Sequence, residues 1–267
     1  MKLAYSTIGC PEWEWDEVLS TASDLGYRGI EIRGVGKETY APAIAAFSPT
    51  QRDHSMESLK RLNLTLTCLT STCTLGQADG FDAALAEGRA YIDLAAALGV
   101  PFVRVLGETT AAPEAAVDDA LVAKGLRALA EHAQGTGVTV LLETSGHYAD
   151  THRLAALFDG LDTAKLGILW DVHHPFRFAG EAPQETLAHI GKWVKYIHLK
   201  DSVLAGGRVQ YRMLGDGDLP LREMFDGLRT LGYDGWYTLE WVRRWDMTLE
   251  EPGIAFARFA ATMQNFA

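Results

Sequence analysis

Short apolar segments alternate with longer amphipathic segments along the chain. The apolar segments have four to six residues and are often β-branched, as is typical of strands buried on both faces of a parallel sheet. We predict eight such strands, at residues 3–7, 29–33, 64–69, 101–106, 138–142, 166–170, 194–197 and 236–239.

The segments between these strands have the spacing of helices with one apolar face. Such stripes begin near Phe81, Val117 and Leu221. Prolines at residues 113, 183 and 220 indicate helix starts, and glycines at 26, 99 and 232 indicate helix ends. Eight strands alternating with eight helices in 267 residues predict a (β/α)8 TIM barrel, with residues 1–267 as a single domain. An open doubly wound sheet is disfavoured, since no G-x-G-x-x-G motif follows the first strand.

Four of the predicted strands are followed directly by a residue type that binds metals. These residues are Glu143, Asp171, His198 and Glu240. Taken singly, each has an ordinary explanation as a helix cap, a solvated loop acid or a core histidine. Taken together they would converge at the carboxyl end of the barrel, where three acids are unfavourable without a cation between them. Three oxygen ligands and one nitrogen suit Mn²⁺, Mg²⁺, Co²⁺ or Fe²⁺, whereas a structural zinc site more often uses cysteine.

Composition limits the classes of function. The chain is 48% hydrophobic and 22% charged, as ordinary soluble proteins are, and no apolar stretch long enough to span a membrane is expected. A net charge of −11 argues against a nucleic-acid partner, which needs a basic surface. We expect no signal peptide, because a strand follows Lys2 at once. Cys10, Cys68 and Cys73 lack any CxxC pairing, so we expect no disulfide framework and a reducing, cytoplasmic location.

Several short motifs together resemble one known family. They are LLETSG around Glu143, WDVHH at 170–174, IHLKD at 197–201, LGDGDL from 214, and GWYTLEW, which contains Glu240 and ends at Trp241. The chain resembles the xylose isomerase-like TIM barrel superfamily, in the branch of sugar (phosphate) isomerases and epimerases that includes ketose 3-epimerases, hydroxypyruvate isomerase and inosose dehydratase. The resemblance implies one divalent metal ion held by Glu143, Asp171, His198 and Glu240. Mn²⁺ is favoured, with Mg²⁺, Co²⁺, Fe²⁺ or Zn²⁺ open.

The resemblance also implies an activity. A divalent ion that chelates a carbonyl and its neighbouring hydroxyl is a Lewis acid and stabilises the enediolate left when the α-proton departs. Glu143 and Glu240 would flank the substrate as the acid and base of a sugar isomerase or epimerase. The substrate would be a small sugar or sugar derivative, with or without phosphate, and the family allows a homo-oligomer. The alternatives are a metal-dependent lyase or dehydratase on a keto-sugar or inosose, an endonuclease IV-like DNA repair enzyme, and a non-catalytic sugar-binding barrel.

Further polar residues are candidates for substrate contact. The candidates are His174, His147, Lys200 and Arg208. The family's second histidine falls on His174 and would touch a substrate oxygen. His147 could line the mouth of the barrel or lie on a surface loop. Lys200 could hold a substrate hydroxyl or carboxylate, or pair with Asp201. The long loop after the seventh strand carries Arg208 and Arg212, either of which could reach the sugar.

Two further expectations concern packing. Glu31 and Arg33 share one face of the second strand, and with Arg104 they are expected to form an ion pair inside the barrel, with contact to the substrate as the alternative. Trp13 and Trp15 could form a wall of the sugar site or pack between helices, and the same holds for Trp241 and Trp245.

Overall fold

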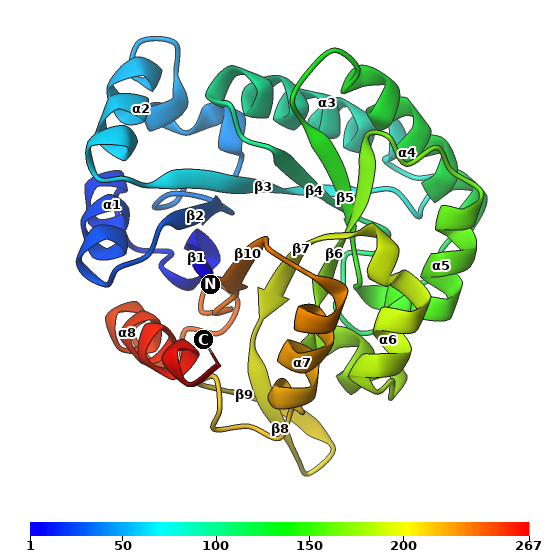
Figure 1. Ribbon diagram of the computed structural model, residues 1–267. Helices are drawn as coiled ribbons and strands as arrows, with labels where there is room; N and C mark the ends of the chain where they lie inside the picture. The colour runs from blue at the N-terminus through cyan, green and yellow to red at the C-terminus, as the bar shows by residue number, and fades with distance from the viewer. Residues whose placement is uncertain (267) are drawn as a thin grey trace.

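A closed barrel of eight parallel strands forms the centre of the molecule (Figure 1). The computed structural model describes residues 1–266. Around the barrel the strands follow the order β1-β10-β7-β6-β5-β4-β3-β2, and β1 pairs with both β2 and β10. The barrel strands are β1 (Lys2–Ser6), β2 (Gly29–Ile32), β3 (Thr65–Thr74), β4 (Phe102–Leu106), β5 (Thr139–Glu143), β6 (Leu166–Asp171), β7 (Val194–Leu199) and β10 (Trp236–Leu239). The prediction of a (β/α)8 barrel is therefore confirmed.

Within residues 1–266, eight α-helices surround the barrel (Figure 1). Each contributes apolar side chains to the core. They are α1 (Trp15–Asp24), α2 (Arg52–Arg61), α3 (Phe81–Leu98), α4 (Asp119–His132), α5 (Thr151–Asp159), α6 (Pro183–Ile190), α7 (Leu221–Leu231) and α8 (Pro252–Met263). Gly99 and Gly232 end α3 and α7 in the left-handed conformation, as the sequence predicted. No helix within residues 1–266 is long and apolar enough to cross a bilayer.

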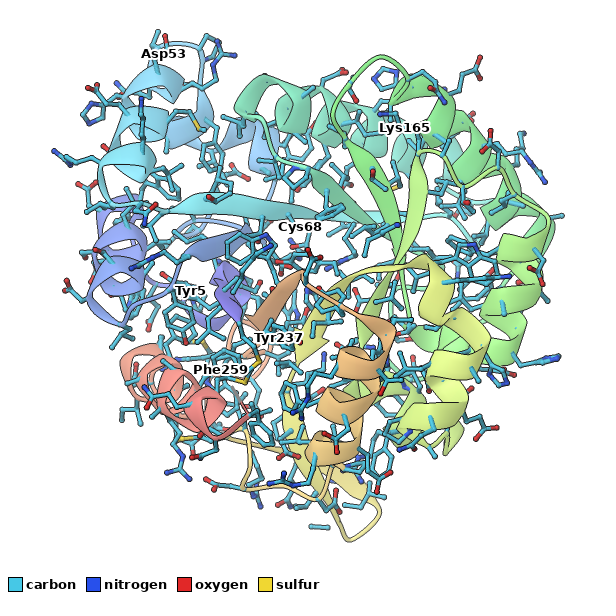
Figure 2. The ribbon with its side chains drawn as sticks, viewed as in Figure 1. Tyr5, Asp53, Cys68, Lys165, Tyr237 and Phe259 are labelled. Carbon is cyan, nitrogen blue, oxygen red and sulfur yellow. The ribbon has the colours of Figure 1, made fainter. Side chains whose placement is uncertain are left out.

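The inside of the barrel is packed with side chains below the carboxyl ends of the strands. Cys68, which Figure 2 labels near the barrel centre, packs with Leu141, Leu169 and Tyr196. The hydroxyl of Tyr196 lies 2.7 Å from the hydroxyls of both Thr67 and Thr238. These contacts satisfy the three buried hydroxyl groups, and the packed side chains close the barrel beneath the site.

Helix α8 covers the seam where the first and last strands meet. The ring of Phe256 stacks on Tyr5 with centroids 4.2 Å apart, and Tyr27 stacks on Phe259. The hydroxyl of Tyr27 donates to the backbone carbonyl of Phe256 at 2.7 Å. Figure 2 labels Tyr5 on β1 and Phe259 on α8.

Two expectations about elements were wrong. Where the sequence suggested a long loop after the seventh strand, β8 (Asp201–Ala205) and β9 (Arg208–Arg212) form an antiparallel hairpin. Its turn is Gly206-Gly207, both with positive φ, which suits a tight two-residue turn. Pro113 does not start a helix: α4 begins at Asp119, and the side chain of Asp118 accepts hydrogen bonds at its N-terminus.

Candidate metal and active site

Four buried side chains from four consecutive strands converge at the carboxyl end of the barrel. Glu143 and Asp171 end β5 and β6, His198 lies near the end of β7, and Glu240 follows β10. Strand register places Asp171 beside His198, and His198 beside Thr238. One ligand atom from each of the four lies within 4.8 Å of every other, and none of the side chains is more than 8% exposed.

The ring of His198 is held so that one nitrogen faces the acids. Its Nε2 lies 2.7 Å from Oε2 of Glu31 on β2. Its Nδ1 is 3.3 Å from Oε1 of Glu240 and 3.9 Å from Oδ2 of Asp171, and it has no hydrogen-bond partner within the described chain. A buried nitrogen without a partner, aimed at carboxylates, is what a metal ligand requires.

Two buried cations, Arg104 and Lys200, form ion pairs with the acids of the cluster. Nε of Arg104, on β4, is 3.0 Å from Oε2 of Glu143. Nζ of Lys200 contacts the carboxylates of both Asp171 and Glu240.

With Glu31 there are four carboxylates against two cations, so the cluster carries two negative charges when all four acids are ionised and His198 is neutral, as a metal ligand must be. Burial alone would lower the pKa of His198, but Glu31 and Glu240 raise it well above its usual value, so a proton occupies the ring when no cation does. The residues therefore fit a divalent ion in donor type and in charge.

The two glutamates differ in their affinity for protons. Burial raises the pKa of Glu143 to about 7, although Arg104 opposes the shift. Burial also acts on Glu240, but Lys200 and His198 hold the pKa of that carboxyl well below its usual range. Two carboxyl groups with pKa values pushed apart are suited to separate acid and base roles.

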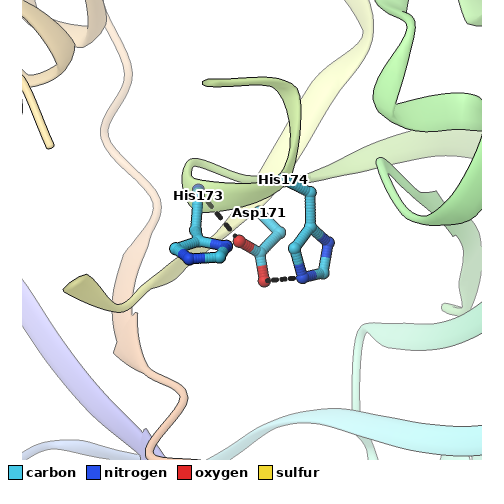
Figure 3. A group of neighbouring side chains, drawn as sticks. All are labelled: Asp171, His173 and His174. Carbon is cyan, nitrogen blue, oxygen red and sulfur yellow. Dashed lines mark hydrogen bonds and ion pairs between the residues drawn. The ribbon is translucent and has the colours of Figure 1, made fainter. Parts of the chain in front are cut away.

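The neighbouring histidines His173 and His174 point in different directions (Figure 3). The backbone N–H of His173 donates to Oδ1 of Asp171 at 3.0 Å, and its ring contacts Ser202. Nδ1 of His174 lies 3.0 Å from the carbonyl oxygen of Thr144 and donates to it, which turns Nε2 toward Asp171 at 3.6 Å. Burial lowers the pKa of His174 well below its usual value, so the ring is neutral at neutral pH.

A cavity of about 590 Å³ opens above the cluster. Its lining includes Arg33, Arg104, Glu143, His174, Lys200, Tyr211, Glu240 and Trp245. The volume is in the range of small-molecule sites. Tyr211 comes from the hairpin, so the element that the sequence missed contributes a wall.

The structure separates the candidates for substrate contact into two groups. His174 and Lys200 line the cavity, and Lys200 pairs with the acids rather than with Asp201. Nδ1 of His147 lies 2.7 Å from Oε2 of Glu108, and His147 does not line the cavity. Arg208 is exposed beside the hairpin turn and also lies outside the lining.

The expected ion pair of Glu31, Arg33 and Arg104 is wrong. Glu31 pairs with His198 across the barrel, and Arg104 pairs with Glu143 on the neighbouring strand. Arg33 instead lines the cavity.

The four tryptophans considered as walls of the sugar site differ in their positions. Trp13 and Trp15 pack edge-on against Phe256 and Phe47, and neither lines the cavity. Trp241 is buried, whereas Trp245 lines the cavity and is 61% exposed. One of the four candidate aromatic walls therefore reaches the site.

Comparison with known proteins identifies the family of this chain. A family model described as xylose isomerase-like TIM barrel matches residues 19–259. The chain belongs to this family. Fructoselysine 3-epimerase of Escherichia coli O157:H7 is 24% identical over 282 residues, covering 98% of both chains. Inosose dehydratase of Geobacillus thermodenitrificans (strain NG80-2) is 25% identical over 138 residues, so the match spans 46% of this chain and only 42% of that enzyme.

Solved structures share the fold over nearly the whole chain. The probable 3-DHS dehydratase AsbF of Bacillus anthracis superposes with a TM-score of 0.81 at 18% identity, covering 99% of both chains. D-Psicose 3-epimerase of Clostridium cellulolyticum H10, solved with D-tagatose, has a TM-score of 0.77 at 17% identity, covering 100% of this chain and 99% of that one. A xylose isomerase-like protein of Mycobacterium smegmatis, solved with magnesium, has a TM-score of 0.76 at 17% identity, covering 99% of this chain and 96% of that one. These likenesses demonstrate the fold.

Proposed function

We propose that this family member is a divalent-metal-dependent sugar isomerase or epimerase. The observation that carries the proposal is the placement of Glu143 and Glu240 in one cavity, on either side of Asp171 and His198. Glu143, Asp171, His198 and Glu240 would hold the ion. Oxygen-rich ligands with one imidazole favour Mn²⁺, with Mg²⁺, Co²⁺, Fe²⁺ and Zn²⁺ as the other candidates.

The ion, when bound, supplies a Lewis acid for the substrate carbonyl. Glu240, which Lys200 and His198 keep ionised, would accept the proton from the carbon next to the carbonyl. Glu143, on the other side of the cavity, has a pKa of about 7 and is therefore partly protonated at neutral pH, and it would return a proton while Arg104 holds its carboxyl group in place. Proton exchange with solvent restores both groups.

Return of the proton to the same carbon from the opposite face inverts the configuration of that carbon. Return to the neighbouring carbon moves the carbonyl group. Nε2 of the neutral His174 positions a substrate hydroxyl by accepting its hydrogen bond.

A metal-dependent dehydratase is the second candidate. It is favoured by the similarity to inosose dehydratase and to the probable dehydratase AsbF. Both reactions begin with the same proton removal, so the same residues serve either. The reactions differ in whether the substrate then loses water.

The test is the metal content of the purified protein. We expect about one Mn, Mg, Co, Fe or Zn per chain in the wild type. Glu143→Gln and Asp171→Asn keep the shape of the side chains but remove a negative ligand, so both should lose the metal. Glu131→Gln, an exposed acid on α4, is the matched control and should keep it.

The second readout is deuterium exchange from solvent into ketoses. Exchange without loss of water supports the isomerase, and exchange with loss of water supports the dehydratase. A protein without bound metal that also fails to take up added Mn²⁺ contradicts both proposals.

A further inference from the structure

Arg33 is a buried cation on the cavity wall opposite the acid cluster. It follows β2, which lies diametrically across the barrel from β6 and Asp171. The residue is only 6% exposed, yet it lines the cavity. Its backbone N–H donates to the hydroxyl of Thr7 at 2.9 Å, and its guanidinium lies 5.4 Å from the ring centre of Trp245. These contacts fix the backbone of Arg33 and place its guanidinium beside Trp245 in the cavity lining.

The guanidinium of Arg33 has no acidic partner. It forms no ion pair with any carboxylate in residues 1–266, and its one hydrogen bond to a protein group is at 3.5 Å, to the carbonyl oxygen of Thr39. The charges that act on it include two cations, Arg104 and Arg244, and one acid, Glu87.

Each of these neighbours is already engaged elsewhere. Glu87 accepts hydrogen bonds from the backbone and hydroxyl of Thr72 at 2.6 and 2.8 Å. Arg104 pairs with Glu143, and Arg244 donates to the carbonyl of Gly36.

A buried cation without a counter-ion is unfavourable. Burial and the nearby Arg104 lower the pKa of Arg33 to about 10, which still leaves it charged at neutral pH. Among the three cations of the cavity, Arg104 and Lys200 have carboxylate partners. Arg33 is thus the one cation in the lining, within the described chain, whose charge the protein leaves uncompensated.

We propose that Arg33 binds an anionic group, a carboxylate or a phosphate, at the end of the substrate remote from the acid cluster. The substrate is then an acidic keto-sugar rather than a neutral one. This assignment of the substrate class rests on the proposed function, because that function places the reacting carbonyl at the other end. The anion site is inferred only from the burial of Arg33 and from its lack of an acidic partner, not from the proposed function. A planar guanidinium can hold either group through two parallel hydrogen bonds.

The test compares three ligands that are identical from C1 to C5. D-Fructose is neutral, D-fructuronate carries a carboxylate at C6, and D-fructose 6-phosphate carries a phosphate there. Their dissociation constants are measured by titration calorimetry on the metal-loaded protein. We expect at least one of the two anions to bind about ten- to a hundred-fold more tightly than D-fructose, as a buried hydrogen bond between charged groups would give.

Variants of Arg33 identify the source of this difference. Arg33→Gln should abolish the preference for the anion while D-fructose binds as before, and Arg33→Lys should restore part of it. Arg28→Gln, an exposed arginine at the other end of β2, is the matched control and should change nothing. A tighter carboxylate identifies a sugar acid, and a tighter phosphate identifies a sugar phosphate.

Other outcomes would overturn the inference. It fails when neither anion binds more tightly than D-fructose to the wild type, including the case in which no binding of either anion is detected. It fails also when Arg33→Gln weakens all three ligands equally. The wild-type comparison stands even if Arg33→Gln does not fold. Metal content and deuterium exchange are measured on the same samples, so a failed proposed function is distinguished from a failed anion site.

Discussion

The two ring nitrogens of His198 have different tasks. Nδ1 faces Asp171 and Glu240, while Nε2 is fixed by Glu31 from the far side of the barrel. A carboxylate behind a metal-binding histidine sets the orientation of the ring and the position of its proton. If the proposed metal site is right, Glu31 is a positioning residue for it, although Glu31 is not itself one of the proposed ligands.

We predict that Glu31→Gln weakens metal binding by about ten- to a hundred-fold while leaving the stoichiometry near one. The amide can still contact Nε2, but it removes the negative charge that supports the ring. Competition of the protein with a chelator of known affinity measures the effect. Glu131→Gln serves as the control, and an unchanged affinity in Glu31→Gln would show that Glu31 has only a packing role.

The proposed ligands and their supporting residues were not equally predictable. Glu143, Asp171, His198 and Glu240 follow apolar strands, and parallel strands end at one edge, so their convergence could be expected from the sequence. The contact between Glu31 and His198 joins residues 167 positions apart. The alternation of side chains along the second strand places Glu31 inside the barrel. Its partner, however, is determined only when the barrel closes and brings β2 across the barrel from β7.

The loop between β4 and α4 depends on one buried carboxylate. The side chain of Glu108 accepts hydrogen bonds from the backbone N–H groups of Glu114 at 2.8 Å, Ala115 at 2.6 Å and His147 at 3.0 Å. The ring of His147 adds a fourth contact. Glu108 thus joins this loop to the segment after β5, and it explains why His147 turns away from the cavity.

We predict that Glu108→Gln lowers the free energy of unfolding by about 1.5–3 kcal/mol, the usual contribution of a hydrogen bond to a charged group. Chemical denaturation at pH 7 measures the loss. Glu114→Gln, an exposed acid in the same loop, should change stability by less than about 0.5 kcal/mol.

The same carboxylate predicts a pH dependence. Burial alone would raise the pKa of Glu108, but the N–H groups of Ala115 and Glu114 and the ring of His147 lower it below its ordinary value. A lowered folded-state pKa stabilises the protein fully above the ordinary glutamate pKa of about 4.3, and the contribution is lost as the pH falls below it. The stability difference between wild type and Glu108→Gln should therefore shrink between about pH 5 and pH 3. A constant difference over that range would contradict this explanation.

At the level of elements, barrel strands were easier to predict than the parts that close the site. Most barrel strands are apolar runs, and their burial on both faces leaves a clear pattern. The exception is β3, whose threonine-rich second half continues to Thr74, beyond the predicted end at residue 69. The hairpin β8–β9 is half exposed and mixes polar with apolar residues, so it lacks that pattern. The Gly206-Gly207 pair was its one strong signal, because both residues require positive φ.

For the whole molecule, the barrel closes where β1 pairs with β10, and α8 packs over this junction. Phe256 is fully buried and touches rings on β1 and beside α1, so it spans the seam between the two ends of the chain. We predict that Phe256→Ala lowers the free energy of unfolding by about 3–5 kcal/mol. Ile254→Ala, two residues away and 57% exposed, should cost less than about 0.5 kcal/mol.

Thermal unfolding followed by two probes checks this prediction. Near-ultraviolet and far-ultraviolet circular dichroism should shift together in Phe256→Ala, since the seam holds the closed sheet as one unit. A far-ultraviolet transition that stays at the wild-type temperature would mean that α8 detaches without opening the barrel.

The cavity divides along the chain as well as across the barrel. Arg33, Thr72 and Arg104 come from the first four strands, whereas Glu143, Lys200 and Glu240 come from the last four. If both proposals hold, the groups that handle the proton and the group that recognises the distant end of the ligand are encoded in different stretches of the gene, although Glu31 and Arg104 support the second-half residues from the first half. A descendant of this barrel could then acquire a new substrate through a change at position 33, while Glu31, Arg104 and the second half of the chain preserve the reaction.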